Sequence, residues 1–65
     1  MRVFINNSGY EIVDNSTLQQ ALLNFGAKPP YAILVNDVFL SQSEHAHLAL
    51  TEHDRIEVIS AIQGG

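Results

Sequence analysis

The stretch that decides the fold is Asp14-Asn15-Ser16-Thr17-Leu18-Gln19-Gln20-Ala21-Leu22-Leu23-Asn24-Phe25-Gly26, residues 14–26. It opens with residues that favour helix N-caps, and both Ser16-x-x-Gln19 and Thr17-x-x-Gln20 fit a capping box. Its apolar residues recur at helical spacing and form one stripe, made of Leu18, Ala21, Leu22 and Phe25. Gly26 occupies the position at which helices end in the left-handed conformation, and Pro29-Pro30 prevents resumption. The stretch therefore predicts one short amphipathic helix.

Segments typical of β-strands lie on both sides of this helix. Upstream, the alternation around Val3 and Ile5 predicts a strand, and the turn signal Asn7-Ser8-Gly9 predicts a hairpin with a second strand over 10–13. The hairpin loop is expected to be slightly longer than two residues. Downstream, residues 31–35, 38–40 and 55–60 predict three more strands, while residues 41–50 fit a loop or a brief helical turn.

The element order β-β-α-β-(β)-β predicts an α+β fold with the helix packed across one face of the sheet. Ile56 and Val58 are expected to face the core. The opposite face then stays open, and the alternation places Phe4 and Ile59 on it. Exposed apolar groups of this kind are either scattered surface residues or a docking face for a partner.

Length, charge and cysteine content exclude several classes of protein. Sixty-five residues make one domain at most, and three basic against seven acidic residues give a net charge of −4 without a basic cluster. This balance argues against nucleic acid as a partner and favours a basic protein surface. The sequence has no cysteine, hence no disulfide, thiolate metal site or cysteine nucleophile. No membrane partner is predicted and a cytoplasmic location is expected, because no signal peptide or bilayer-spanning apolar run is evident.

Residues that could carry chemistry within the domain are few. No Ser-His-Asp spacing or glycine-rich phosphate loop is present, so the protein is not expected to be an enzyme. The one candidate metal cluster is His45, His47 and His53, which lacks a known ligand spacing and is interpreted as solvated surface histidines. No metal site and no intrinsic cofactor are therefore expected. Solvated side chains are also expected for the pair Asp54 and Glu57 and for Lys28.

The end of the sequence offers a different kind of site. Residues 1–60 are expected to form the domain, and residues 61–65 to project from it as a flexible tail. Two glycines let a backbone enter a cleft too narrow for any Cβ, so a partner enzyme could reach the carboxyl carbon of Gly65. The alternative is a frayed end that happens to be Gly-Gly.

Three motifs together resemble the ThiS family, the ubiquitin-like sulfur carriers of thiamine (thiazole) biosynthesis. The run Asp54-Arg55-Ile56-Glu57-Val58-Ile59-Ser60-Ala61-Ile62-Gln63-Gly64-Gly65 resembles the family's C-terminus. Thr17-Leu18-x-x-x-Leu22-Leu23 is similar to its helix start, and Tyr31-Ala32-x-x-Val35-Asn36-x-x-Phe39 to its central strand and turn. The resemblance covers essentially the whole chain and implies the β-grasp fold, with one helix across one face of a mixed sheet.

Two departures from the family pattern stand out. Leu40-Ser41-Gln42 replaces the usual Val-Pro-Arg, which questions any partner contact made by that arginine. His53 replaces a glycine, which implies a turn residue that tolerates positive φ less easily.

The resemblance also implies a reaction. A ThiF-like adenylating partner would use ATP and Mg²⁺ to activate the Gly65 carboxylate, and a cysteine desulfurase would supply the sulfur of a thiocarboxylate. A ThiG-like thiazole synthase would then receive that sulfur. On this interpretation Ile62, Gln63 and Gly64 lie in the partner's groove, and Phe4 and Ile59 help to dock the carrier.

Three other functions stay open at this point. The first is a carrier for another pathway, like the small subunit of molybdopterin synthase. The second is a ubiquitin-like protein modifier, and the third is a binding domain whose diglycine is incidental.

Overall fold

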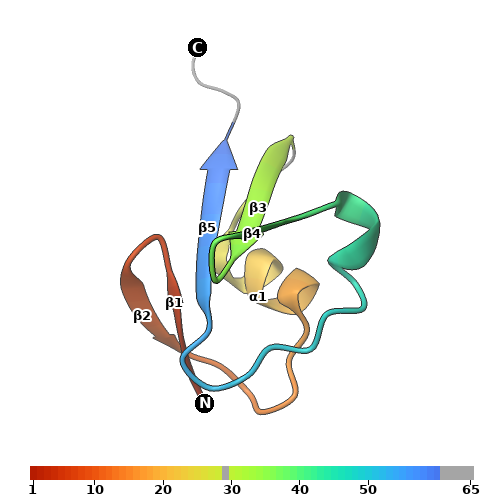
Figure 1. The fold of residues 1–65 in the computed structure, drawn as a ribbon. Helices are drawn as coiled ribbons and strands as arrows, with labels where there is room; N and C mark the ends of the chain where they lie inside the picture. The colour runs from red at the N-terminus through yellow and green to blue at the C-terminus, as the bar shows by residue number, and fades with distance from the viewer. Residues whose placement is uncertain (29, 61–65) are drawn as a thin grey trace.

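A computed structural model of the protein describes residues 1–28 and 30–60. In chain order the elements are β1 (Arg2–Ile5), β2 (Ser8–Glu11), α1 (Leu18–Phe25), β3 (Tyr31–Val35), β4 (Val38–Leu40), the 3₁₀ turn η1 (Gln42–Glu44) and β5 (Arg55–Ser60) (Figure 1). The strands form one sheet in the order β2-β1-β5-β3-β4. Strands β1 and β5 are parallel, and all other neighbours are antiparallel. The predicted α+β arrangement is confirmed.

Helix α1 begins and ends where the sequence predicts. The Thr17 hydroxyl accepts a hydrogen bond from the Gln20 N–H at 3.2 Å, and the Gln20 side-chain oxygen accepts one from the Thr17 N–H at 2.9 Å. This reciprocal pair satisfies two backbone donors that a helix start would leave without partners. At the other end Gly26 has φ 91°, and its N–H donates to the carbonyls of Leu22 and Leu23. The cap residues therefore fix the length of the helix.

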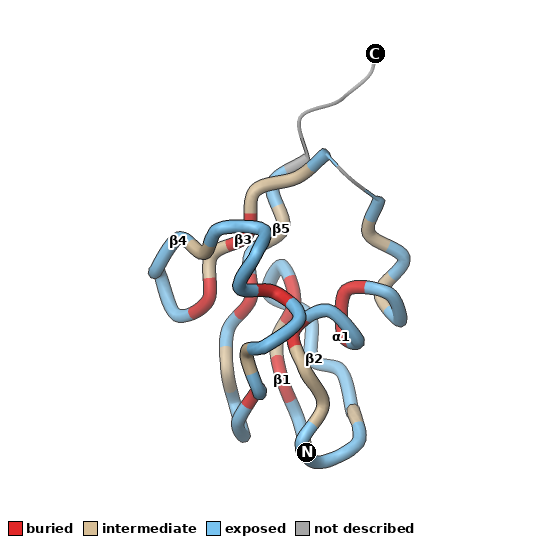
Figure 2. The backbone as a smooth tube through the Cα atoms, turned by 90° about the vertical axis from the view of Figure 1, so that its right-hand side faces the viewer, coloured by how far each residue is buried: buried red, intermediate tan, exposed pale blue. Residues whose placement is uncertain are grey.

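The core lies between α1 and the face of the sheet that the helix covers, and Figure 2 marks its residues in red. Its buried apolar members are Val3, Ile5, Leu18, Ala21, Leu22, Ile33, Val35, Leu50 and Ile56. Val58 packs partly buried against this cluster, so the predicted inward direction of Ile56 and Val58 is confirmed. A fully buried valine, leucine or isoleucine contributes about 1.5–3 kcal/mol, so the core is the main source of stability in so small a domain.

The first hairpin differs from the prediction in its turn and in its second strand. The turn consists of Asn6 and Asn7 alone, with φ 51° and 71°, and β2 begins at Ser8 rather than at residue 10. Positive φ at both central positions matches the type I′ turn, whose twist suits a two-residue hairpin and which asparagine tolerates. The prediction of a longer loop was wrong because Gly9 pairs with Phe4 inside the strand instead of forming the turn.

The segment 41–50 crosses to the helix side of the sheet. The Leu18 N–H donates to the Leu48 carbonyl and the Leu50 N–H donates to the Ser16 carbonyl, both at 2.9 Å. These bonds tie the segment to the start of α1 and bury Leu50.

This segment also corrects the expectation for one histidine. His45 is 4% exposed, and its ring stacks on that of Tyr31 with ring centroids 6.0 Å apart. The expectation of a solvated side chain was wrong for His45, because the segment folds back over the core. His47 and His53 are exposed, as expected. Among residues 1–28 and 30–60, no group of three potential metal ligands is present.

No helix in the described part of the chain is both long enough and apolar enough to cross a membrane.

Candidate functional site

Strand β5 lies at the centre of the sheet and carries the chain toward the predicted tail. It pairs with β3 over five residue pairs, from Tyr31 with Ser60 to Val35 with Ile56, and with β1 over two. Figure 1 shows the carboxyl end of β5 pointing away from the N-terminus. The predicted tail residues Ile62, Gln63, Gly64 and Gly65 lie outside the described residues, as does the boundary of the tail at 61. Their roles stay predictions.

Two asparagines at hairpin turns fix β5 from both flanks. The side-chain oxygen of Asn6 accepts a hydrogen bond from the Val58 N–H at 2.9 Å. The side-chain oxygen of Asn36 accepts one from the Arg55 N–H at 3.0 Å. Both residues have φ 51° at the start of a two-residue turn, so the backbone conformation of the turn aims each amide at the strand. The central strand is therefore held by hydrogen bonds to side chains in both turns as well as by backbone hydrogen bonds to the neighbouring strands.

The carboxylate of Asp54 anchors the start of β5. It accepts hydrogen bonds from the Thr51 N–H at 2.8 Å, the Thr51 hydroxyl at 3.0 Å and the Asn36 amide at 3.0 Å. Burial raises the pKa of Asp54. The hydrogen bonds from Thr51 and Asn36 to the ionised form together lower the pKa by more than burial raises it, so the pKa lies below its ordinary value of 3.8. The expectation of a solvated pair was therefore wrong for Asp54. Glu57 is exposed, as expected, and so is Lys28.

Phe4 and Ile59 both lie on the sheet face opposite the helix, where the sequence places them. Phe4 stands between the buried residues Val3 and Ile5, and Ile59 is 52% exposed next to the partly buried Val58. The structure does not bring the two side chains together. Phe4 is level with Arg55, four residues before Ile59, which corresponds to about 13 Å along the strand. They lie toward opposite ends of one face.

Two apolar residues that the sequence analysis did not select also belong to this face. Leu34 is the cross-strand neighbour of both Glu57 and Phe39, so the three form one row across β5, β3 and β4. Leu34 is half-buried, and Phe39 is 64% exposed. A signal was present in the unbroken apolar run of residues 31–35, since such a run makes both faces of a strand apolar. We refer to Phe4, Leu34, Phe39 and Ile59 as the open-face cluster.

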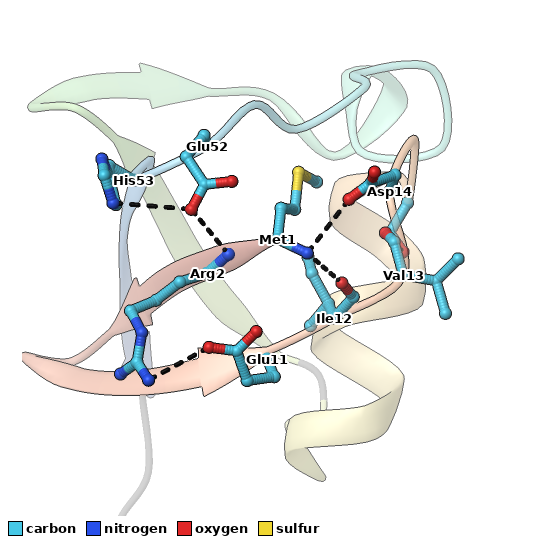
Figure 3. Close-up of polar contacts among 9 residues, drawn as sticks. Met1, Arg2, Glu11, Ile12, Val13, Asp14, Glu52 and His53 are labelled. Atoms are coloured by element: carbon cyan, nitrogen blue, oxygen red, sulfur yellow. Dashed lines mark hydrogen bonds and ion pairs between the residues drawn. The ribbon is translucent and has the colours of Figure 1, made fainter.

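Two ion pairs involve residues of the strands and turns that carry this cluster. Arg55 and Asp37 form an ion pair at 3.3 Å, and Arg2 and Glu11 form one at 3.0 Å. Figure 3 shows the second pair beside Glu52, whose carboxylate accepts a hydrogen bond from the Arg2 N–H at 3.1 Å. Exposed pairs of this kind contribute little stability, so their main effect is on the electrostatic surface that a partner meets.

His53 adopts the backbone conformation that its position in the sequence predicts. It has φ 69°, in the left-handed region, and its ring lies 6.3 Å from that of Phe4. The turn before β5 therefore requires a positive φ at the residue where the family pattern has a glycine.

A mixed five-stranded sheet crossed by one helix, with the last strand at its centre, defines a ubiquitin-like β-grasp protein. A sequence model of the ThiS family matches residues 3–65, and the chain belongs to this family. The fold is similar to that of the thiamine biosynthesis protein ThiS from Geobacter metallireducens, with a TM-score of 0.75 and 16% identity over 100% of both chains. A search of curated proteins found no match.

Proposed function

We propose that this protein is a sulfur carrier of thiamine biosynthesis whose working group is the carboxylate of Gly65. The observation that carries the proposal is the ThiS family match, which spans residues 3–65 and so includes the final diglycine. The absence of cysteine from the sequence supports it, because no thiol of the carrier itself competes for an activated acyl group. The carrier itself is not an enzyme in this proposal and holds no cofactor of its own.

The chemistry proceeds in steps performed by partner enzymes. A carboxylate resists nucleophiles, so a ThiF-like adenylating enzyme first joins the Gly65 carboxylate to the α-phosphate of ATP, with Mg²⁺, and releases pyrophosphate. The terminal sulfur of a cysteine desulfurase persulfide then attacks the acyl carbon and displaces AMP. A thiol then attacks the desulfurase cysteine sulfur of the resulting acyl disulfide, forms a disulfide with that cysteine and releases the thiocarboxylate. A ThiG-like thiazole synthase takes the sulfur from it, and we place these steps in the cytoplasm.

The proposed roles of the other residues follow from their places in the chain. Ile62, Gln63 and Gly64 would occupy the narrow groove that leads to the adenylating site. The open-face cluster, which includes Phe4 and Ile59, would dock the domain on the partner enzymes. An apolar sheet face beside the strand that leads to the reactive end suits this role, since docking there holds the end of β5 at a defined distance from the surface of contact.

The test is the intact mass of the protein after incubation with ATP, Mg²⁺, a ThiF-class enzyme, a cysteine desulfurase and cysteine. The expected change is the replacement of one oxygen by sulfur. Deletion of Gly65, or addition of one alanine after it, should abolish the change. Lys28→Ala is the control, since Lys28 is exposed and lies in the loop before β3. Loading of the variant with the added alanine would contradict the proposal.

Transfer experiments separate the proposal from its alternatives. The loaded protein should support thiazole formation by a ThiG-class synthase and should not convert a molybdopterin precursor with the large subunit of molybdopterin synthase. Denaturing immunoblots of a cell lysate should show one band. A ladder of larger species would indicate a protein modifier instead.

A further inference from the structure

The open face contains a hollow of about 320 Å³ that apolar and charged residues line together. The lining consists of Phe4, Asn7, Leu34, Asp37, Arg55, Ile56 and Glu57, of which Ile56 is otherwise buried in the core. Phe4 and Leu34 belong to the open-face cluster, so the hollow lies on the surface that the proposed function assigns to docking.

The charges around the hollow do not balance. Arg55 and Asp37 form an ion pair with each other at 3.3 Å. Glu57 forms no ion pair or side-chain hydrogen bond with any residue among 1–28 and 30–60. One guanidinium and two carboxylates line the space, so its net charge is −1. The excess negative charge belongs to Glu57.

The position of Glu57 makes this carboxylate costly to cover. Its cross-strand neighbour is Leu34, followed by Phe39, so apolar groups extend beside it. A partner that buries the open-face cluster also removes Glu57 from water. Burial of an uncompensated carboxylate is strongly unfavourable, whereas a cation placed beside it offsets the loss of hydration. A complementary surface must therefore supply one positive charge at this point.

We propose that the adenylating partner presents a single arginine that enters the hollow and pairs with Glu57. This inference rests on the proposed function and adds the feature by which the partner recognises the carrier. Arginine fits better than lysine, because a planar guanidinium can bind a carboxylate while it lies against the ring of Phe4. A partner surface without the cation, or with an acidic residue there, is rejected, so Glu57 determines specificity as well as affinity.

The test measures ATP–pyrophosphate exchange by a purified ThiF-class enzyme at varied carrier concentration. Glu57→Gln should raise the KM for the carrier about 10-fold with kcat unchanged, and should flatten the dependence of KM on salt. Glu57→Lys should raise KM about 100-fold, because two like charges then meet. Glu57→Asp keeps the charge and should stay within about threefold of wild type, since the pair tolerates a shorter side chain better than a lost charge.

Glu44→Gln is the matched control. The Glu44 carboxylate accepts a hydrogen bond from the Ser41 N–H at 3.2 Å, and glutamine keeps an acceptor oxygen there. The variant removes the same unit of charge from segment 41–50, on the helix side of the sheet. Its KM should match wild type within about twofold, because an exposed charge outside a contact acts only at long range.

Each outcome has a separate meaning. Equal KM values and equal salt dependence for Glu57→Gln and Glu44→Gln would overturn the inference while the carrier function stands, because both variants are still adenylated. Failure of the wild-type protein to support exchange would remove the proposed function and the inference together. If wild type sediments as a dimer and Glu57→Gln as a monomer, the occupant is a second copy of this chain, which also overturns the inference.

Discussion

The side-chain oxygen of Asn6 accepts a hydrogen bond from the Val58 N–H at 2.9 Å, beyond the last pairing of β1 with β5 at Ile5 and Ile56. The Asn6 backbone N–H donates to the Ile56 carbonyl at 2.9 Å in the same place. An amide side chain thus takes the position that a strand carbonyl would fill. The parallel ladder continues for one more bond after β1 has turned away into its hairpin.

Replacing Asn6 by glycine should destabilise the domain. Glycine keeps the positive φ of the turn but removes the acceptor for Val58, a loss of about 1 kcal/mol. Urea denaturation would measure the change in the free energy of unfolding, and amide hydrogen exchange would show faster exchange at Val58. Asn7→Gly is the control, because Asn7 also has positive φ, at 71°, but makes no side-chain hydrogen bond within the described residues. Equal effects of the two substitutions would contradict the role of the Asn6 amide.

Replacing His53 by glycine should stabilise the domain. A residue other than glycine in the left-handed region costs about 1–2 kcal/mol of stability, which the substitution would recover. Two effects offset part of this gain: the contact of His53 with Phe4 is lost, and glycine has more freedom in the unfolded chain. The net gain should be up to about 1 kcal/mol, seen as a melting temperature about 4–8 °C higher. His47→Gly should lower the melting temperature, because His47 is exposed with negative φ. A lower melting temperature for His53→Gly would refute the strain at this turn.

Asp54 should make the stability of the protein sensitive to acid. Its pKa is lower in the folded state than the ordinary 3.8, so its contribution is complete above pH 3.8 and is lost as the pH falls through the lower folded value. The urea midpoint should therefore decrease as the pH falls below 3.8, because the folded carboxylate takes up its proton at a lower pH than the unfolded one. Asp54→Asn should be less stable at pH 7 and should show a shallower decrease. An unchanged slope in the variant would assign the acid sensitivity to other groups.

The ion pair between the Met1 ammonium and Asp14 should make the stability of the protein decrease at alkaline pH. The Met1 ammonium donates to the Asp14 carboxylate at 3.0 Å and to the Ile12 carbonyl at 2.7 Å (Figure 3). The hydrogen bond to Asp14 raises the pKa of this ammonium above 8.0 against the effect of burial. Its contribution is therefore complete below pH 8.0 and is lost as the pH rises through the raised folded pKa.

The urea midpoint measured from pH 7 to pH 10 checks this expectation. Asp14→Asn should show a smaller loss of stability over that range, since asparagine keeps an acceptor without the charge. A wild-type midpoint that stays constant across the range would contradict the role of the Met1–Asp14 pair.

The helix and the order of the elements along the chain could be predicted from the sequence because they depend on local signals, whereas the strand order in the sheet was not predicted. The capping box at Thr17 and Gln20 and the glycine after Phe25 each act within a few residues. The same logic placed Phe4 and Ile59 on the open face, since alternation along a strand fixes the side on which a residue lies.

The features that sequence reasoning missed depend on contacts between distant segments. Gly9 looked like a turn residue, and only its pairing with Phe4 places it inside β2. The burial of His45 depends on a return of segment 41–50 to the helix, which no periodicity encodes. Leu34 and Phe39 were missed because β3 and β4 are both runs of apolar residues, so their patterns do not say which residues stay uncovered.

The placement of β5 has a mechanical consequence. Strands β1 and β5 are parallel neighbours, so a force applied between Met1 and Ser60 acts along both strands and loads the hydrogen bonds between them in shear. The five residue pairs with β3 resist the same displacement from the other flank. Bonds loaded together must break together, whereas those of a peeled hairpin break one at a time. A partner that grips the chain beyond Ser60 would therefore pull on the strand that this domain holds most firmly.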